Sequence, residues 1–132
     1  MDPIANMLVQ IKNAQRAKHE HVVVPFSRNK FAIANILKSV GYISDVEKRS
    51  KKAKKTEHDV LFVALKYEDS LGAISGIKMI SKPSRRMYIK ANEIKPVRSG
   101  YGLAVVSTSK GIMTSMEASK HKLGGEILFE IW

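Results

Sequence analysis

The chain has 132 residues, with 23 Lys and Arg against 12 Asp and Glu, so its formal net charge is +11 and its isoelectric point is about 10.0. Hydrophobic residues make up 44% of the sequence, which is enough for a packed core and excludes a disordered tail. This length fits one domain or two small ones. The excess of cations favours a polyanionic partner, with nucleic acid ahead of an anionic membrane.

Features that the sequence lacks narrow the class of protein further. There is no cysteine, which excludes disulfides, thiolate metal sites and cysteine nucleophiles. No apolar run approaches the ~20 residues that a membrane span requires. Asp2 stands where a secretory signal peptide carries positive charge. We therefore expect a cytoplasmic protein with no membrane partner.

The first half of the chain has the pattern of a small sheet packed against two helices. Its predicted order is helix, strand, helix, strand, strand, at about residues 3–18, 21–26, 27–40, 42–49 and 59–67. Pro3 suits the first position of a helix, Ser27 suits an N-cap, and Gly41 suits a helix stop. The apolar run VLFVAL is typical of a strand covered on both faces.

The second half of the chain is predicted to form mainly strands. They are predicted at about residues 77–81, 85–94, 103–107 and 126–132, with turn-rich breaks at 82–85 and 95–102. Thr114 and Glu117 form a capping box that starts a short helix near residue 114. In the last strand, Ile127, Phe129 and Ile131 are expected on one face.

These elements predict an α+β fold of two small domains. An N-terminal α-β-α-β-β domain is expected at residues 1–68, and a C-terminal domain, mainly β with one short helix, at residues 69–132. The change in composition at residues 68–76 marks a candidate linker between them.

No arrangement of residues indicates catalysis. Ser107 and Lys110 match the S-x-x-K spacing of penicillin-recognising enzymes, but the accompanying S-D-N and K-T-G motifs are absent. There is no P-loop motif. The histidines are not joined by an acidic cluster that could complete a metal site: His19, His21, His58 and His121. We therefore expect no enzymatic activity, no metal and no cofactor.

The densest run of charge is residues 48–55, which hold six Lys and Arg in eight residues. We predict a basic loop between two strands. It is either a solvated hairpin tip or a contributor to non-specific RNA affinity, because such cations neutralise phosphates without reading sequence.

A second basic group surrounds an aromatic residue in the C-terminal half. Lys82, Arg85 and Arg86 flank a predicted turn, and Tyr88 and Lys90 follow on the same strand face as Arg86. Tyr88 is either a core residue or a platform that stacks on a base or ribose.

The stretch STSKG, residues 107–111, follows a buried strand and is interpreted as a polar loop leading to the short helix. Its hydroxyls both donate and accept hydrogen bonds, so they suit base edges and 2′-hydroxyls in the shallow minor groove of RNA. Gly111 permits close approach of a backbone. A plain connecting loop is the alternative.

Several segments together resemble the bacterial small-subunit ribosomal protein eight family. The matching segments cover nearly the whole chain: DPIANMLVQIKNA, VPFSRNK, ISKPSRRMYIK with its EIKPVRSGYG continuation, STSKGIMT, and GGE before a last strand that ends in Trp132.

The resemblance implies a two-domain α+β protein that binds the central domain of 16S ribosomal RNA early in small-subunit assembly and represses translation of its own operon mRNA. Ribosomal proteins five and twelve are the implied neighbours. The RNA-binding residues that it implies are Tyr88, Ser107, Thr108, Ser109 and Glu126, with Lys110, Gly111, Gly124 and Gly125 beside them. We add the cations of the matching segments: Lys30, Lys82, Arg85 and Arg86.

The sequence departs from the family in two places. The run at residues 48–55 is unusually rich in lysine, so the family's contacts are not transferred to it. Ser115 and Ser119 stand where the family has an acid and an arginine in its short helix, so a phosphate contact by that helix is in doubt. Phosphates would repel Glu126, so it serves either as an acceptor for hydroxyl or amino donors or as a plain exposed carboxylate.

Two rival functions remain at this point. One is a general RNA- or DNA-binding module outside the ribosome, although neither long helix carries the clustered base-reading residues of a recognition helix. The other is a small hydrolase built on Ser107 and Lys110.

Overall fold

In the computed structural model, residues 2–53, 56–94 and 102–132 are described, and they confirm the predicted α+β class. The chain divides into two compact units, one of residues Pro3–Ala73 and one that contains Ile74–Trp132. The division falls inside the segment 68–76 that was predicted as a linker. None of the helices in the described ranges is long and apolar enough to cross a membrane.

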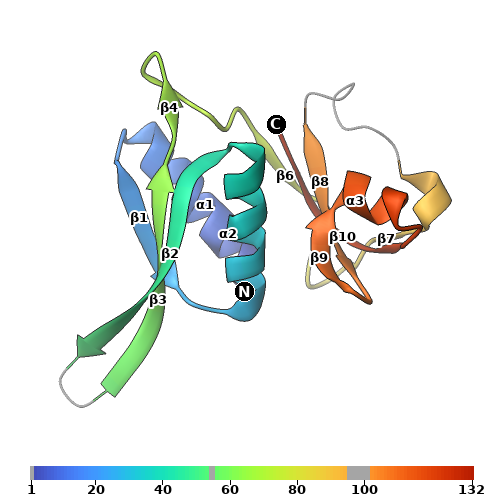
Figure 1. The fold of residues 1–132 in the computed structure, drawn as a ribbon, viewed down its shortest axis with the longest axis horizontal. Helices are drawn as coiled ribbons and strands as arrows, with labels where there is room; N and C mark the ends of the chain where they lie inside the picture. The colour runs from blue at the N-terminus through green and yellow to red at the C-terminus, as the bar shows by residue number, and fades with distance from the viewer. Residues whose placement is uncertain (1, 54–55, 95–101) are drawn as a thin grey trace. The chain divides into compact units, whose positions relative to one another are not determined.

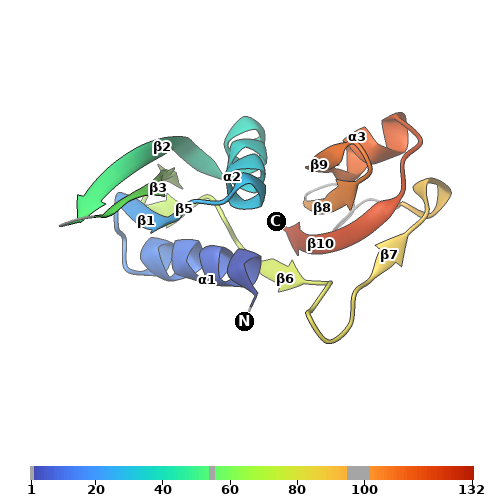
Figure 2. The ribbon, with the colours of Figure 1, turned by 90° about the horizontal axis from the view of Figure 1, so that it is seen from below.

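The N-terminal unit has the predicted order of elements. They are α1 (Pro3–Arg16), β1 (His21–Pro25), α2 (Arg28–Val40), β2 (Ile43–Ala53) and β3 (Thr56–Leu65). The strands form an antiparallel sheet in the order β1-β3-β2, and both helices lie on one of its faces (Figures 1 and 2). Its core is built from fully buried apolar side chains of both helices and the sheet, among them Met7, Leu8, Ile11, Ile33, Leu37, Leu61 and Val63.

Both predicted ends of α2 are confirmed. The Ser27 hydroxyl accepts a hydrogen bond from the Lys30 N–H at 3.2 Å. Gly41 adopts a left-handed backbone with φ of 103°, and its N–H donates to the carbonyls of Leu37 and Lys38. A side chain at that φ would be strained, which is why the helix ends at a glycine.

The expectation that β3 is covered on both faces is wrong. Leu61, Val63 and Leu65 are buried, but the residues between them are only partly covered, because both helices lie on the same side of the sheet. The open face carries a stack of three planar groups. The Phe62 ring lies between the His21 ring, at 4.4 Å between centroids, and the Arg49 guanidinium, whose Cζ is 3.9 Å from the Phe62 centroid.

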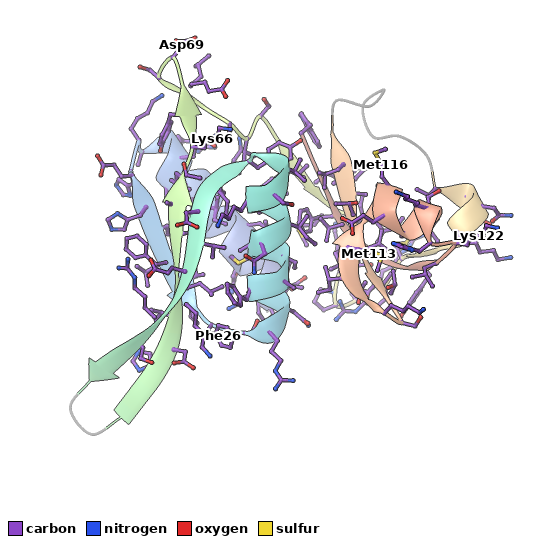
Figure 3. The ribbon with its side chains drawn as sticks, in the orientation of Figure 1. Phe26, Lys66, Asp69, Met113, Met116 and Lys122 are labelled. Carbon is purple, nitrogen blue, oxygen red and sulfur yellow. The ribbon has the colours of Figure 1, made fainter. Side chains whose placement is uncertain are left out.

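The lysine-rich segment is mostly strand, so the predicted basic loop is wrong for residues 48–53. β2 and β3 continue past the end of β1 as a two-stranded arm, paired as far as Ala53 and Thr56 (Figure 1). The Lys48 ammonium lies 4.5 Å from the ring centroid of Phe26, which Figure 3 labels, and 3.5 Å from the Asp59 carboxylate. These contacts and the strand pairing hold the basic residue in an extended backbone.

The predicted linker also contains regular structure. Two short strands, β4 (Tyr67–Glu68) and β5 (Leu71–Gly72), pair through a turn in which Asp69 and Ser70 have φ of 50° and 66°. Two consecutive residues with positive φ are the requirement of the tight turn that joins twisted antiparallel strands. The segment is therefore a small hairpin that projects from the N-terminal unit, with Asp69 at its tip (Figure 3).

The C-terminal unit is a sheet in the order β6-β10-β8-β9, with β7 also paired to β10. Its elements are β6 (Ile77–Met79), β7 (Tyr88–Ile89), the 3-10 helix η1 (Ala91–Glu93), β8 (Leu103–Thr108), β9 (Gly111–Thr114), α3 (Ser115–Lys120) and β10 (Gly125–Ile131). The N-cap at Thr114 is confirmed, because its hydroxyl accepts from the Glu117 N–H at 3.2 Å. The Glu117 carboxylate accepts from the Thr114 hydroxyl at 3.4 Å and not from the backbone N–H that a full capping box uses. Most of the predicted turn at 95–102 lies outside the described residues.

Two strand predictions in this unit are wrong. The strand expected over 85–94 is only Tyr88–Ile89, followed by the 3-10 helix. A bulge at Leu128 breaks the alternation in β10, so Ile127 pairs with Val106 whereas Phe129 pairs with Val105. Since residues directly opposite each other share a face, Ile127 does not share the face of Phe129.

Phe129 is the largest fully buried side chain among the described residues. Its strand, β10, pairs with β8 on one side and with β6 on the other. We expect Phe129→Ala to lower the free energy of unfolding by about 3–5 kcal/mol, because it removes a large ring and leaves a cavity. Urea unfolding followed by circular dichroism measures this. A loss below about 1 kcal/mol would contradict the packing described for β10.

Candidate nucleic-acid interface

The strand register brings three of the predicted RNA-binding residues into one row. Glu126 on β10 lies directly opposite Tyr88 on β7 and directly opposite Ser107 on β8. Residues opposite each other in antiparallel strands project from the same face, with Cβ atoms about 5 Å apart. A phenol, a carboxylate and a hydroxyl, which are far apart in the sequence, therefore lie side by side. We call them the Tyr88–Glu126–Ser107 row.

The three side chains of the Tyr88–Glu126–Ser107 row differ in their exposure to solvent. Tyr88 is 71% exposed, so the interpretation of Tyr88 as a core residue is wrong. The Glu126 side chain is 20% exposed, and Ser107 is half-buried. An exposed aromatic ring beside partly sheltered polar groups offers both a stacking surface and fixed hydrogen-bonding groups.

The STSKG stretch is the turn of a hairpin. The prediction that it leads straight into the short helix is wrong. β8 pairs with β9 through the turn at Ser109 and Lys110, and the short helix follows β9. Thr108 closes this turn. Its hydroxyl donates to the Gly111 carbonyl at 2.8 Å and accepts from the Lys110 N–H at 3.1 Å. Gly111 has a φ of 115°, which a residue with a side chain rarely adopts.

The three hydroxyls of the turn therefore differ in availability. The Thr108 hydroxyl is engaged within the turn, whereas those of Ser107 and Ser109 have no hydrogen-bond partner among the residues that the structure describes. Ser109 is also exposed. Ser107 and Ser109 are free to bond a ligand, and Thr108 holds the backbone that presents them.

Gly124 and Gly125 let β10 start at the Tyr88–Glu126–Ser107 row. A Cβ atom at position 125 would lie 2.1 Å from the Ser107 carbonyl oxygen, and one at position 124 would lie 2.6 Å from that of Ile89. Both contacts are with backbone atoms, which cannot move aside as a flexible side chain can. The two glycines therefore allow β10 to approach β8 and the β7 segment closely enough to form the row.

Ser81 is a positioning residue that the sequence analysis did not identify. It is 2% exposed, and its hydroxyl accepts from the Met87 N–H at 2.9 Å and donates to the Met87 carbonyl at 3.3 Å. The same carbonyl accepts from the Ile127 N–H. This clamp fixes the backbone between Arg86 and Tyr88. An isolated serine before a Lys-Pro pair does not stand out in a sequence.

The predicted cations fall into two kinds. Lys82 and Arg85 close a tight turn through reciprocal backbone hydrogen bonds of 3.0 and 2.9 Å, and their exposed side chains have no ion-pair partner among the described residues. Lys110 is exposed at the hairpin tip. Arg86 differs, because its Nη1 lies 3.4 Å from Oε2 of Glu126.

Lys30 belongs to the N-terminal unit and is not one of this group. Its side chain is buried, with 8% exposed, and its ammonium donates to the Pro25 carbonyl at 3.3 Å. Its RNA contact stays a prediction.

The two serines that replace a charged pair in the short helix have different environments. Ser115 is buried at the start of α3, and Ser119 is exposed. Between them Met116 is 78% exposed on the outer side of α3 (Figure 3). A neutral Ser115 needs no partner charge in its buried position, so the helix is compatible with the loss of both charges.

Comparison with known proteins identifies the family of this chain. A family model described as Ribosomal protein S8 matches residues 2–132. The chain belongs to the ribosomal protein S8 family. Small ribosomal subunit protein uS8 of Mycoplasmopsis synoviae (strain 53) is 48% identical over 131 residues, 99% of this chain and 97% of the relative.

Further members of the family come from distant bacteria. Small ribosomal subunit protein uS8 of Persephonella marina (strain DSM 14350 / EX-H1) is 48% identical over 134 residues, covering 99% of this chain and 98% of the relative. That of Sorangium cellulosum (strain So ce56) is 43% identical over 132 residues, with the same coverage. The resemblance predicted from the sequence is confirmed. Members of this family are structural ribosomal proteins and not enzymes, so Ser107 and Lys110 are not a catalytic pair.

The hydrogen bonds of Thr108 predict a role in the turn itself. We expect Thr108→Val, which keeps the shape but removes the hydroxyl, to lower the free energy of unfolding by about 1 kcal/mol. Ser109→Ala is the matched control and should change it by less than about 0.5 kcal/mol, since its hydroxyl bonds nothing within the described residues. Urea unfolding of both variants measures the difference. Equal stabilities would contradict the closure of the turn by Thr108.

Proposed function

We propose that this chain binds the central domain of 16S ribosomal RNA and helps to assemble the platform of the small subunit. The observation that carries the proposal is the strand register that aligns Tyr88, Glu126 and Ser107, with the free Ser109 hydroxyl at the adjoining turn. Membership of the ribosomal protein S8 family supports the choice of partner.

The chemistry of the Tyr88–Glu126–Ser107 row suits a folded RNA better than duplex DNA. Hydroxyls that donate and accept can bond base edges and 2′-hydroxyls, and an exposed Tyr88 ring can stack on an unpaired base. Lys82, Arg85 and Lys110 supply free positive charge around this face. In this division of roles, cations hold the phosphates and the row discriminates the RNA.

The proposal extends to the other partners of the chain. Ribosomal proteins five and twelve are its neighbours in the cytoplasmic small subunit, and its own operon mRNA is a second RNA ligand. One binding face serves both RNAs, because a messenger segment that copies the shape of the ribosomal site presents the same groups to the same side chains. Repression then needs no additional surface on the protein.

Substitution of a free hydroxyl and of a free cation separates the two roles. We expect Ser109→Ala to reduce affinity for a central-domain transcript by about 1–2 kcal/mol and to leave the salt dependence of binding unchanged, because a hydrogen bond is lost and no charge. Arg85→Gln should flatten the slope of log affinity against log salt by about 0.7–0.9, the value for one phosphate contact. It should weaken cognate and scrambled RNA alike.

Filter-binding titrations over a range of salt concentrations, with cognate and scrambled transcripts, measure both quantities. The proposal is wrong if the unmodified protein does not distinguish the two transcripts. The division of roles is wrong if both variants change affinity and slope in the same way.

A further inference from the structure

Glu126 places a negative charge on the proposed RNA-binding face. Glu126 stands between Tyr88 and Ser107, where nearby phosphates of a bound RNA would repel its negative charge. With 20% of its side chain exposed, it is also partly removed from the water that would screen it. A negative group in this position is stable only if a positive group offsets it.

Arg86 provides that positive group. Its Nη1 donates to Oε2 of Glu126 at 3.4 Å, and the other carboxylate oxygen, Oε1, has no hydrogen-bond partner among the described residues. The pair therefore leaves one acceptor oxygen of Glu126 available, on a residue that lies opposite Ser107. A guanidinium whose charge is offset by a carboxylate attracts a phosphate less strongly than one without such a partner.

The position of Arg86 is built into the backbone. Ser81 holds both polar backbone groups of Met87, and Ile127 bonds the Met87 carbonyl from β10. Arg86 and Glu126 thus project from two segments that are tied together next to the Tyr88–Glu126–Ser107 row. The side chain of neighbouring Arg85 has no such contact with any residue that the structure describes, although it carries the same charge one residue away.

We infer that Arg86 is a positioning residue that holds Oε2 of Glu126, so that Oε1 accepts a hydrogen bond from an N–H or O–H donor of the RNA. This inference rests on the proposed function. It assigns Arg86 a role different from that of the phosphate-binding cations with which the sequence grouped it. The positive charge of Arg86 offsets the negative charge of Glu126, so that a carboxylate oxygen can accept a hydrogen bond from the RNA close to its phosphates. Removal of Arg86 leaves that carboxylate unheld and its charge uncompensated.

A double-mutant cycle tests this assignment with the full chain and the cognate and scrambled transcripts. We expect R86Q to weaken cognate binding roughly tenfold, the effect of one charge-assisted hydrogen bond, without a change in salt slope. In the E126Q background the same change should leave discrimination between the transcripts unchanged, because no carboxylate remains to be held. It should flatten the salt slope by about 0.7–0.9, because the released Arg86 is then a phosphate contact. R85Q is the matched control, and it should flatten the slope by about 0.7–0.9 in either background.

E126Q alone gives an independent result that does not require the R86Q variant to fold. Loss of the carboxylate charge releases Arg86 to bind a phosphate, so the salt slope should steepen by about 0.7–0.9 while discrimination between the transcripts falls. Thermal unfolding of each variant checks that the fold is retained.

Two outcomes overturn the inference. One is that the effects of R86Q and E126Q add and R86Q alone flattens the slope as R85Q does, which makes Arg86 a phosphate contact. The other is that E126Q leaves slope and discrimination unchanged. If the unmodified protein fails to prefer the cognate transcript, the proposed function fails instead, so the two failures are distinguishable.

Discussion

The proposed recognition face depends on how closely β10 approaches its neighbours at Gly124 and Gly125. At this point the strand runs so near the backbone of β8 and of the β7 segment that a Cβ atom would overlap a carbonyl oxygen on either side. That approach sets the register, and the register sets which side chains meet. The Tyr88–Glu126–Ser107 row is a direct consequence, because Glu126 follows Gly125. A slip of one residue would send Glu126 to the other face.

The polar groups around the row have separate tasks that their contacts define. Thr108 and Ser81 satisfy the backbone and shape the turn and the β7 segment, so they act by position. Ser107, Ser109 and Tyr88 present polar groups that have no hydrogen-bond partner within the described ranges. In the proposed function, fixing the first set before RNA arrives lowers the entropy lost when the second set binds. A rigid arrangement of a few polar groups can therefore discriminate an RNA shape in a chain whose charge alone would bind any polyanion.

Much of the fold was predictable because local chemistry agrees with it. The cap at Ser27, the stop at Gly41 and the cap at Thr114 lie where the sequence places them. The failures have physical causes that a local pattern does not contain. β3 is covered on one face only because both helices pack against the same side of the sheet, and no local pattern in β3 records that. The bulge at Leu128 depends on pairing with a distant strand.

The candidate site was predictable in its members but not in their roles. Hydroxyls, glycines and cations are visible in the sequence, and the family resemblance selected among them. The hydrogen bonds that separate Thr108 from Ser109, and the ion pair that separates Arg86 from Arg85, form only when strands meet in a particular register. β9 was missed because it is four residues long and directly precedes a strong helix cap, so the cap dominates the local pattern.

The most direct test of the central claim is a titration of the ¹⁵N-labelled full chain with an unlabelled central-domain transcript, followed by NMR chemical-shift changes. The account predicts the largest changes at the backbone amides of Tyr88, Ser107, Ser109, Gly125 and Glu126, which saturate together at one equivalent of RNA. Largest changes within residues 3–73, with those amides unmoved, would contradict it.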